Sequence, residues 1–223
     1  MDSETWQILR LTIGVSLLST ALIIPFGLGL AWLLARKSWP GKSLVETVVA
    51  LPLVLPPVAT GFLLLMLLGR RGVLGSLYER LTGSSFAFTW RAVVAAMMVM
   101  SFPLLVRSAR VAFEEVNPRL EQVAATLGSG PLRVFSRITF PLALRGIMAG
   151  VLLAFARGLG EFGATIIVAG NIPGKTSTLA LSIYRFIEDG NDAKAISLIA
   201  ISIVIAFLAI WSSDAFLARG KKD

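Results

Sequence analysis

Long apolar runs separated by short polar segments dominate the chain, and each run is a candidate membrane helix. About 20 apolar residues cross the hydrocarbon core of a bilayer. The charge-free runs of about this length are residues 11–35, 47–69, 92–106 and 195–213. The third run is short, but residues 86–90 before it and a snorkelling Arg107 after it extend it.

A fifth span must lie between residues 141 and about 169, although it contains the charged side chains of Arg145, Arg157 and Glu161. The pattern thus predicts an all-α, polytopic membrane helix bundle with five transmembrane helices. We expect one domain, residues 1–223, with its core at about 11–217. Prolines that remove a backbone hydrogen bond predict bends in or beside the spans: Pro25, Pro52, Pro56, Pro57 and Pro103.

The composition agrees with a membrane protein and excludes several kinds of chemistry. Hydrophobic residues make up 56% of the 223 residues and charged residues 15%, whereas a soluble domain has about 25% charged residues. The chain has no cysteine and no histidine, so it has no disulfides, thiol chemistry or imidazole catalysis, and we expect no metal site and no cofactor. The net charge of +8 comes from short basic clusters between apolar runs, which indicates membrane-flanking loops rather than a nucleic-acid partner.

Five spans put the two termini on opposite sides of the membrane, and the basic residues predict which side is which. Twelve Lys and Arg fall on the side of the C-terminus, among them Arg219, Lys221 and Lys222, and eight fall on the other side. Cytoplasmic loops are enriched in these residues, so we expect the N-terminus outside and the C-terminus inside. Asp2 and Glu4 precede any basic residue, unlike the start of a signal peptide, so the first run is expected to stay as a span.

The segment EQVAATLGSGPLRVFSRITFP, residues 121–141, is polar and broken by glycine. Asn117 is a good N-cap with Pro118 at the first helical position, and Gly128 closes the helix that follows. A second short helix begins at Pro131 and is expected to stop by Pro141, where the next span starts. In the predicted topology this loop, about residues 114–141, is cytoplasmic.

One face of this loop carries almost no side chain, because it is formed by Ala124, Ala125 and Gly128. Another protein can therefore approach the backbone closely there. The spacing alone fits two interpretations equally: an amphipathic loop that rests on the membrane, or a docking element.

A family resemblance favours docking. The order Glu121, then the Ala124 and Ala125 pair, then Gly128, and later Ile138 and Pro141 resembles the EAA loop of the permease subunits of ATP-binding-cassette importers. Two features depart from that pattern, since Gln122 and Val123 separate the glutamate from the alanines and Phe140 replaces a leucine. The resemblance implies a type I importer transmembrane fold with short cytoplasmic coupling helices. It assigns contact with an ATPase to Glu121, Ala124, Ala125, Gly128, Pro131 and Pro141.

Within that superfamily the chain is similar, over about residues 11–217, to molybdate permease subunits, with sulfate permeases next. The similarity rests on the blocks ARKSWPGKS at 35–43, LPLVLPPVATG at 51–61, GRRGVLG at 69–75 and FARGLGEFGATIIVAGNIPGKT at 155–176. It implies import of molybdate and possibly tungstate, with sulfate or thiosulfate as the alternative. It also implies cytoplasmic ATPase subunits, an extracytoplasmic molybdate-binding protein, a homodimer and a place in the lipid of the inner membrane.

The chain does not carry its own ATPase motif. A phosphate-binding loop has the form G-x-x-x-x-G-K-[ST]. The sequence offers Gly-Lys-Ser at 41–43 and Gly-Lys-Thr at 174–176, but Arg36 and Ala169 occupy the position of the first glycine. Both trios are therefore interpreted as turns, and the chain is expected to be no enzyme.

Arg157 and Glu161 stand four residues apart in the span at 141–169, which puts them on one face of a helix. An unpaired charge at that depth costs at least about 2.5 kcal/mol, so we expect them to pair or to face a wet cavity. Two roles stay open: an ion pair that only fixes packing, or a pore or gate. The candidate pore or gate residues are Arg157, Glu161, Phe162, Gly163 and Thr165.

Two other classes lack essential parts. A secondary anion transporter or channel needs residues for ion coupling or selectivity, yet no acidic residue lies in the runs at 11–35, 47–69 or 195–213. A membrane enzyme without His or Cys would need a Ser–Lys pair, and Lys42 and Lys175 lie in loops predicted on opposite sides. Neutral hydroxyls in the spans can serve as hydrogen-bond donors for a passing anion: Ser16, Ser19, Thr60, Ser101 and Thr165.

Overall fold

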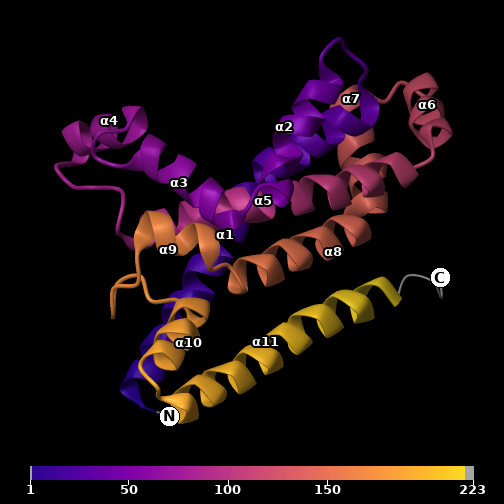
Figure 1. Ribbon diagram of the computed structural model, residues 1–223. Coiled ribbons are helices and arrows are strands. Elements are labelled where there is room, and N and C mark those ends of the chain that lie inside the picture. Colours follow the sequence, from indigo (N-terminus) through magenta and orange to yellow (C-terminus); the bar gives the residue numbers. More distant parts are fainter. Residues whose placement is uncertain (1, 219–223) are drawn as a thin grey trace.

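The computed structural model describes residues 2–218, with side chains through residue 212. The regular elements in this range are all helical (Figure 1). They are α1 (Ser3–Arg36), α2 (Lys42–Val54), α3 (Pro57–Leu68), α4 (Val73–Thr82), α5 (Trp90–Glu115), α6 (Pro118–Thr126), α7 (Pro131–Val134), the π-helical turn η1 (Phe135–Thr139), α8 (Phe140–Leu159), α9 (Gly163–Ala169), α10 (Leu179–Glu188) and α11 (Asp192–Ala218). Arg219, Lys221 and Lys222, which entered the charge count, lie outside the described residues.

Helices α1, α5 and α11 are each long and apolar enough to cross a membrane, and so is the continuous helix Pro131–Leu159. The pair α2 and α3 supplies a fifth span if it is counted as one unit. An all-helical membrane bundle is therefore confirmed.

The second apolar run is not the single span that the sequence predicts, because α2 and α3 meet at an angle of 112°. Leu55 and Pro56 between them have extended ψ angles of 142° and 132°. Each of the two precedes a proline, which disfavours the helical conformation of the residue before it. Two such residues in succession turn the expected bend into a sharp corner.

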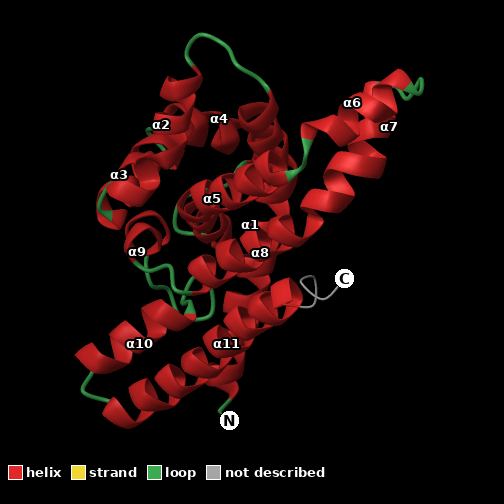
Figure 2. Ribbon diagram, turned by 90° about the vertical axis from the view of Figure 1, so that its right-hand side faces the viewer, coloured by secondary structure: helices red, strands yellow, loops and turns green. Residues whose placement is uncertain are grey.

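The core is formed by α1, α5 and α8, with α1 and α5 parallel and α8 antiparallel to them (Figures 1 and 2). Small residues let these helices approach closely. A Cβ atom on Gly146 would lie 2.6 Å from Cβ of Ala112, and one on Gly150 would lie 2.7 Å from Cβ of Ser108. This close contact of α8 with α5 is typical of membrane helices, where packing rather than the hydrophobic effect drives association.

The first span begins at Ser3, earlier than the predicted residue 11. Its first turns are held by packing and by charge. Ile8 and Leu9 are buried among side chains of α10 and α11, and the carboxylate of Glu4 bonds with Arg185 and with Lys194 Nζ, the latter at 3.2 Å. The helix therefore includes the polar stretch of residues 3–10, which lies outside the predicted apolar run.

The span at residues 141–169 also differs from the prediction at both ends. At its start, α7 continues through η1 into α8 without stopping by Pro141, which lies in the first turn of α8. The N–H of Phe140 bonds with the carbonyl of Phe135, five residues back, and this wider turn accommodates a proline that has no N–H to donate. At its end, α8 stops at Leu159, and three non-helical residues separate it from the short helix α9.

Candidate functional site

The segment that joins α5 to α8 forms a helical protrusion at one end of the bundle, with α6 and α7 at its tip (Figure 1). Its turns follow the predicted caps. Oδ1 of Asn117 accepts a hydrogen bond from the backbone N–H of Arg119 at 3.0 Å. After α6, Gly128 has a φ of +84°, and the N–H groups of Gly128 and Ser129 each donate to a carbonyl of the last turn at 3.0 Å. This left-handed C-cap fixes the angle between the two short helices.

The exposed surface of this protrusion is apolar and low. Ala125 and Gly128 are exposed, Ala124 is half-buried, and Pro131 is the exposed first residue of α7. Large apolar side chains surround them, with exposed fractions between 48% and 81%: Leu120, Val123, Leu127 and Leu132. Exposed apolar clusters of this kind mark interaction surfaces. The predicted coupling residues are thus brought together, except Pro141, which lies beyond η1 in α8.

The carboxylate of Glu121 is bound within the chain, beside an open hollow that it lines together with Ala125 and Pro131. Its Oε1 accepts a hydrogen bond from Nη2 of Arg36 at 2.9 Å and another from Oγ1 of Thr139 at 2.6 Å. Sequence reasoning missed Arg36 and Thr139, which stand 85 and 18 residues from Glu121.

The second candidate site lies at the other end of α8, where the helix breaks. Nη1 of Arg157 lies 2.7 Å from Oε2 of Glu161, so the expected pairing is confirmed. The reason given for it was wrong, since Glu161 stands past the end of the helix that carries Arg157. The carboxylate is 1% exposed, and its Oε1 accepts a hydrogen bond from the N–H of Ala164 at 2.8 Å. One buried carboxylate thus pairs with the last arginine of α8 and accepts a backbone N–H in the first turn of α9.

Helix α9 is held against the corner between α2 and α3 by contacts that only small residues allow. A Cβ atom on Gly163 would lie 2.7 Å from Cβ of Pro57, and one on Gly61 would lie 2.6 Å from the carbonyl oxygen of Ala164. Phe162, half-buried, packs on Tyr184 of α10 with 5.1 Å between ring centroids. The broken end of α8 therefore touches α3, α9 and α10 at once.

The hydroxyl groups considered as donors for a passing anion are all buried, at most 4% exposed. Oγ of Ser19 donates to the carbonyl of Ser16 at 3.0 Å. In the described part of the chain Thr60, Ser101 and Thr165 have no hydrogen-bond partner for their hydroxyls. In this conformation these groups therefore face the interior of the bundle.

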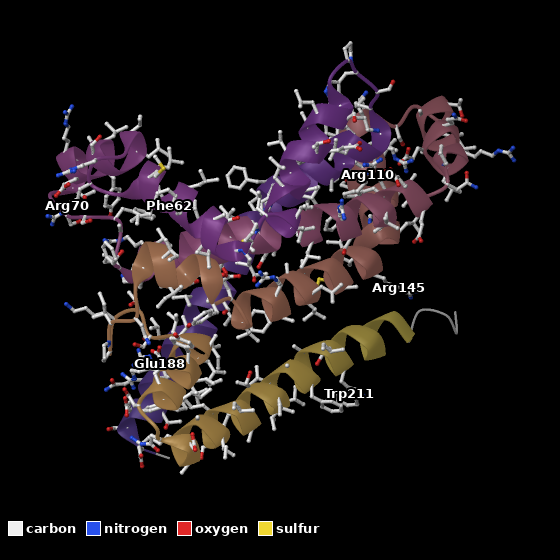
Figure 3. The ribbon with its side chains drawn as sticks, viewed as in Figure 1. Phe62, Arg70, Arg110, Arg145, Glu188 and Trp211 are labelled. Carbon is white, nitrogen blue, oxygen red and sulfur yellow. The ribbon has the colours of Figure 1, made fainter. Side chains whose placement is uncertain are left out.

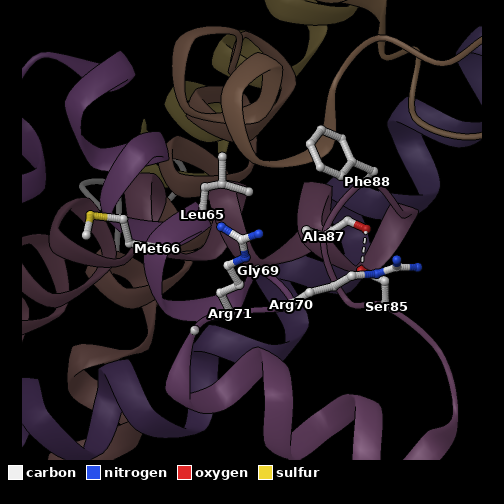
Figure 4. A pocket seen from close by; sticks show the side chains of 9 residues that line it. Leu65, Met66, Gly69, Arg70, Arg71, Ser85, Ala87 and Phe88 are labelled. Carbon is white, nitrogen blue, oxygen red and sulfur yellow. Dashed lines mark hydrogen bonds between the residues drawn. The ribbon is translucent and has the colours of Figure 1, made fainter.

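An open hollow of about 630 Å³ lies between the end of α3 and the chain before α5, and Figure 4 shows its lining. Arg70 and Arg71 from the GRRGVLG block line it together with Phe88. Arg70 pairs with Glu79 at 3.5 Å, and both side chains are solvent-accessible. Guanidinium groups at the mouth of a hollow raise the local concentration of anions.

The predicted turn is confirmed for Gly-Lys-Thr at 174–176, whereas in Gly-Lys-Ser at 41–43 only Gly41 lies in the turn and Lys42 begins α2. Gly41 has a φ of +87° and Gly174 a φ of +74°.

Comparison with known proteins places these features in context. Residues 23–222 match the family model described as "Binding-protein-dependent transport system inner membrane component". The chain is 50% identical over its full length to the molybdenum transport system permease protein ModB of Escherichia coli K12, covering 97% of that protein. It is 42% identical to the protein of the same name from Haemophilus influenzae, with 96% of this chain and 94% of that one covered. It is 38% identical to the sulfate transport system permease protein CysW of Synechococcus elongatus, with 84% of this chain and 64% of that one covered.

The fold has a close counterpart among solved structures. A chain of the MetNI methionine ABC transporter in an inward-facing crystal form superposes with a TM-score of 0.75 at 15% identity, covering 98% of this chain and 99% of that one. At this identity the likeness concerns the fold.

Proposed function

The chain belongs to the family of binding-protein-dependent transport system inner membrane components, and we propose that it is the permease subunit of a molybdate importer, with tungstate as a near-isosteric second substrate. Membership means that it works in the inner membrane with an ATPase and a binding protein. The observation that carries the substrate is the 50% identity over the full length to a molybdenum transport permease.

The protrusion formed by α6 and α7 is the proposed seat of the ATPase. Its exposed Leu127 and Leu132 are about four-fifths accessible, although large apolar side chains on a solvated loop are favourable only when another surface covers them. The low face at Ala125 and Gly128 lets that surface approach the backbone. The partner is proposed to enclose α6 and α7, while η1 connects the movement to α8.

The translocation path is proposed to pass the break after α8, with Arg157, Glu161, Phe162, Gly163 and Thr165 near it. The side chain of Arg157 is 28% exposed although that of its partner Glu161 is 1% exposed. A guanidinium that reaches the surface of a membrane bundle is costly against lipid. A second copy of the chain, with a wet path between the two copies, accounts for that exposure, so we assign the working unit as a homodimer.

The proposed orientation puts α6 and α7 in the cytoplasm and the N-terminus outside. The larger number of Lys and Arg on the side of the C-terminus supports it, because cytoplasmic loops are enriched in these residues. Arg110 lies at the end that carries α6 (Figure 3), as does Arg36, which binds Glu121, whereas Arg185 and Lys194 lie at the end that carries the N-terminus. In the described part of the chain, these basic residues, which the sequence predicts on opposite sides of the membrane, thus lie at opposite ends of the bundle.

The test reconstitutes the chain with its ATPase and binding protein in liposomes and measures uptake of labelled molybdate, tungstate and sulfate. We expect saturable, ATP-dependent uptake of molybdate that excess tungstate inhibits and excess sulfate leaves unchanged. Sulfate is the second candidate, because the sulfate permease relative is 38% identical over 84% of this chain. Uptake of sulfate without uptake of molybdate would reverse the assignment.

A further inference from the structure

Helix α6 is held to the bundle by little packing. None of the residues Pro118–Thr126 is buried in the described structure. Its helical neighbours are α7 and η1. Burial of an apolar face normally fixes the orientation of a helix. Since α6 has no such face, polar contacts and the turns at Asn117 and Gly128 set its position relative to the spans.

Three polar contacts meet at this point. Nη2 of Arg36 lies 2.9 Å from Oε1 of Glu121 and also donates to the backbone carbonyl of Val116 at 3.0 Å. Oγ1 of Thr139 donates to the same Oε1 at 2.6 Å. Hydrogen bonds to ionised groups are shorter and stronger than neutral ones. The charged side chains are mostly shielded from water, with exposed fractions of 14% for Arg36 and 22% for Glu121.

Each partner belongs to a different structural element. Arg36 is the last residue of α1, Val116 is the C-cap of α5, and Thr139 is the last residue of η1 before α8. Because α1, α5 and α8 form the core, this set of contacts joins α6 to all three core helices. We call Arg36, Glu121 and Thr139 the polar lock.

We propose that Arg36 is a positioning residue for energy coupling: through the polar lock it makes α6 move as one body with α1 and η1, so that a displacement of α6 by the ATPase reaches α1 and α8 together. The inference rests on the proposed function of α6 and α7 as the ATPase seat. It means that the C-terminal end of α1, and not only the loop with α6 and α7, transmits the movement of the ATPase to the membrane helices.

The other half of the protrusion is anchored differently. Phe135 in η1 packs on Trp32 and Phe140, with ring centroids 5.9 Å and 6.0 Å apart. These aromatic contacts keep η1 on the bundle when the polar lock is broken. Loss of Arg36 therefore frees α6 to pivot about the turn at Asn117 and leaves the aromatic contacts of η1 in place.

The experiment compares the parent with Arg36→Gln, Arg36→Lys, Glu121→Gln and the double variant Arg36→Gln with Glu121→Gln in the complete reconstituted complex. Arg36→Gln is expected to co-purify with the ATPase and to hydrolyse ATP, while uptake per ATP falls about tenfold, the effect of one lost charge-assisted hydrogen bond. Arg36→Lys, which keeps the charge, restores most of the uptake. The double variant is no worse than the more affected single one, since both remove the same lock.

Arg110→Gln is the matched control. Arg110 also sits at this end and pairs with Glu46 at 2.8 Å and with Glu114 at 2.7 Å. The first ion pair joins α5 to α2 and the second lies within α5, so neither reaches α6. Arg110→Gln is expected to leave uptake per ATP within about twofold of the parent, as for partly exposed ion pairs. A loss in Arg110→Gln equal to that in Arg36→Gln would overturn the proposal.

A second measurement is independent of the substrate. The chain has no cysteine, so Lys37→Cys with Arg119→Cys gives one pair of spin labels in each copy of the chain, both at exposed positions, across the polar lock. Complexes in which labelled chains are diluted with unlabelled ones report the distance within one copy. The label distance is expected to stay the same with and without ATP in the parent and to broaden in Arg36→Gln. An unchanged label distance in Arg36→Gln would overturn the polar lock, even if molybdate uptake succeeds. If the parent fails to take up molybdate but the distance broadens in Arg36→Gln, the result counts only against molybdate as the substrate.

Discussion

Glu161 pairs with Arg157 across the interruption between α8 and α9, with 2.7 Å between Oε2 and Nη1. The same carboxylate caps the following helix by accepting a hydrogen bond from the N–H of Ala164. The glutamate thus balances the charge of Arg157 in α8 and satisfies a free N–H in the first turn of α9. Substitutions separate the two contributions, because glutamine keeps an acceptor for Ala164 while alanine does not.

For the ion pair, we expect Arg157→Gln and Glu161→Gln each to impair assembly or transport, and the double variant to impair it less than the sum of the two. Removing Arg157 leaves the buried carboxylate of Glu161 uncompensated, at a cost of about 3 to 5 kcal/mol, and removing Glu161 leaves Arg157 without its partner. A double-mutant cycle on molybdate uptake and on complex yield measures the coupling. Additive losses would mean that the two residues act separately.

For the cap, Glu161→Ala is expected to be more harmful than Glu161→Gln by about 1 kcal/mol, the usual cost of losing an N-terminal helix cap. The thermal stability of the purified complex is the measurement. Equal stability of the two variants would assign the whole effect of Glu161 to its charge.

Gly128 is predicted to be required for its backbone conformation. Its φ is +84°, and a Cβ there would meet no atom within 4 Å in the described part of the chain. Gly128→Ala should therefore cost about 1 kcal/mol or more through the left-handed backbone alone, and Gly128→Val should add bulk on the proposed ATPase surface. Co-purification of the ATPase, stimulated hydrolysis and uptake are measured together.

Gly130→Ala is the control for Gly128. Gly130 has equally open surroundings and an ordinary φ of −67°. It should behave like the parent, and both Gly128 variants should still insert into the membrane because the segment lies outside the spans. Parent-like coupling in Gly128→Val would reduce this segment to a connector.

Gly61→Ala is predicted to push α3 away from α9. A Cβ at position 61 would lie 2.6 Å from the backbone oxygen of Ala164, and backbone atoms cannot rotate aside as a side chain can. Overpacking of this kind costs about 1 to 3 kcal/mol. Uptake should fall, whereas Gly14→Ala, which meets no described atom within 4 Å, should leave uptake unchanged.

The orientation is tested with single cysteines in this cysteine-free chain. Lys175 and Gln122 are both exposed. An impermeant maleimide should label Lys175→Cys on spheroplasts and label Gln122→Cys only after the membrane is opened. The reverse pattern would place α6 and α7 on the outside.

The sequence by itself determined the features that depend on neighbouring residues. Apolar length predicted four of the five expected spans, of which the second is a bent pair of helices, and the cap at Asn117 and the turn at Gly128 were placed correctly. These are local properties, since a cap or a left-handed turn is set by residues within one helical turn.

Only the tertiary structure decided which distant side chains meet. Nothing in the spacing joins Arg36 to Glu121, because 85 residues separate them and the folding of α1 against α5 brings them together. The contact of Gly163 with Pro57, which packs α9 against α3, likewise joins residues far apart in the sequence. Hydrophobicity shows which parts of the chain are apolar. The position at which a helix ends inside the bundle also depends on its packing against neighbouring helices.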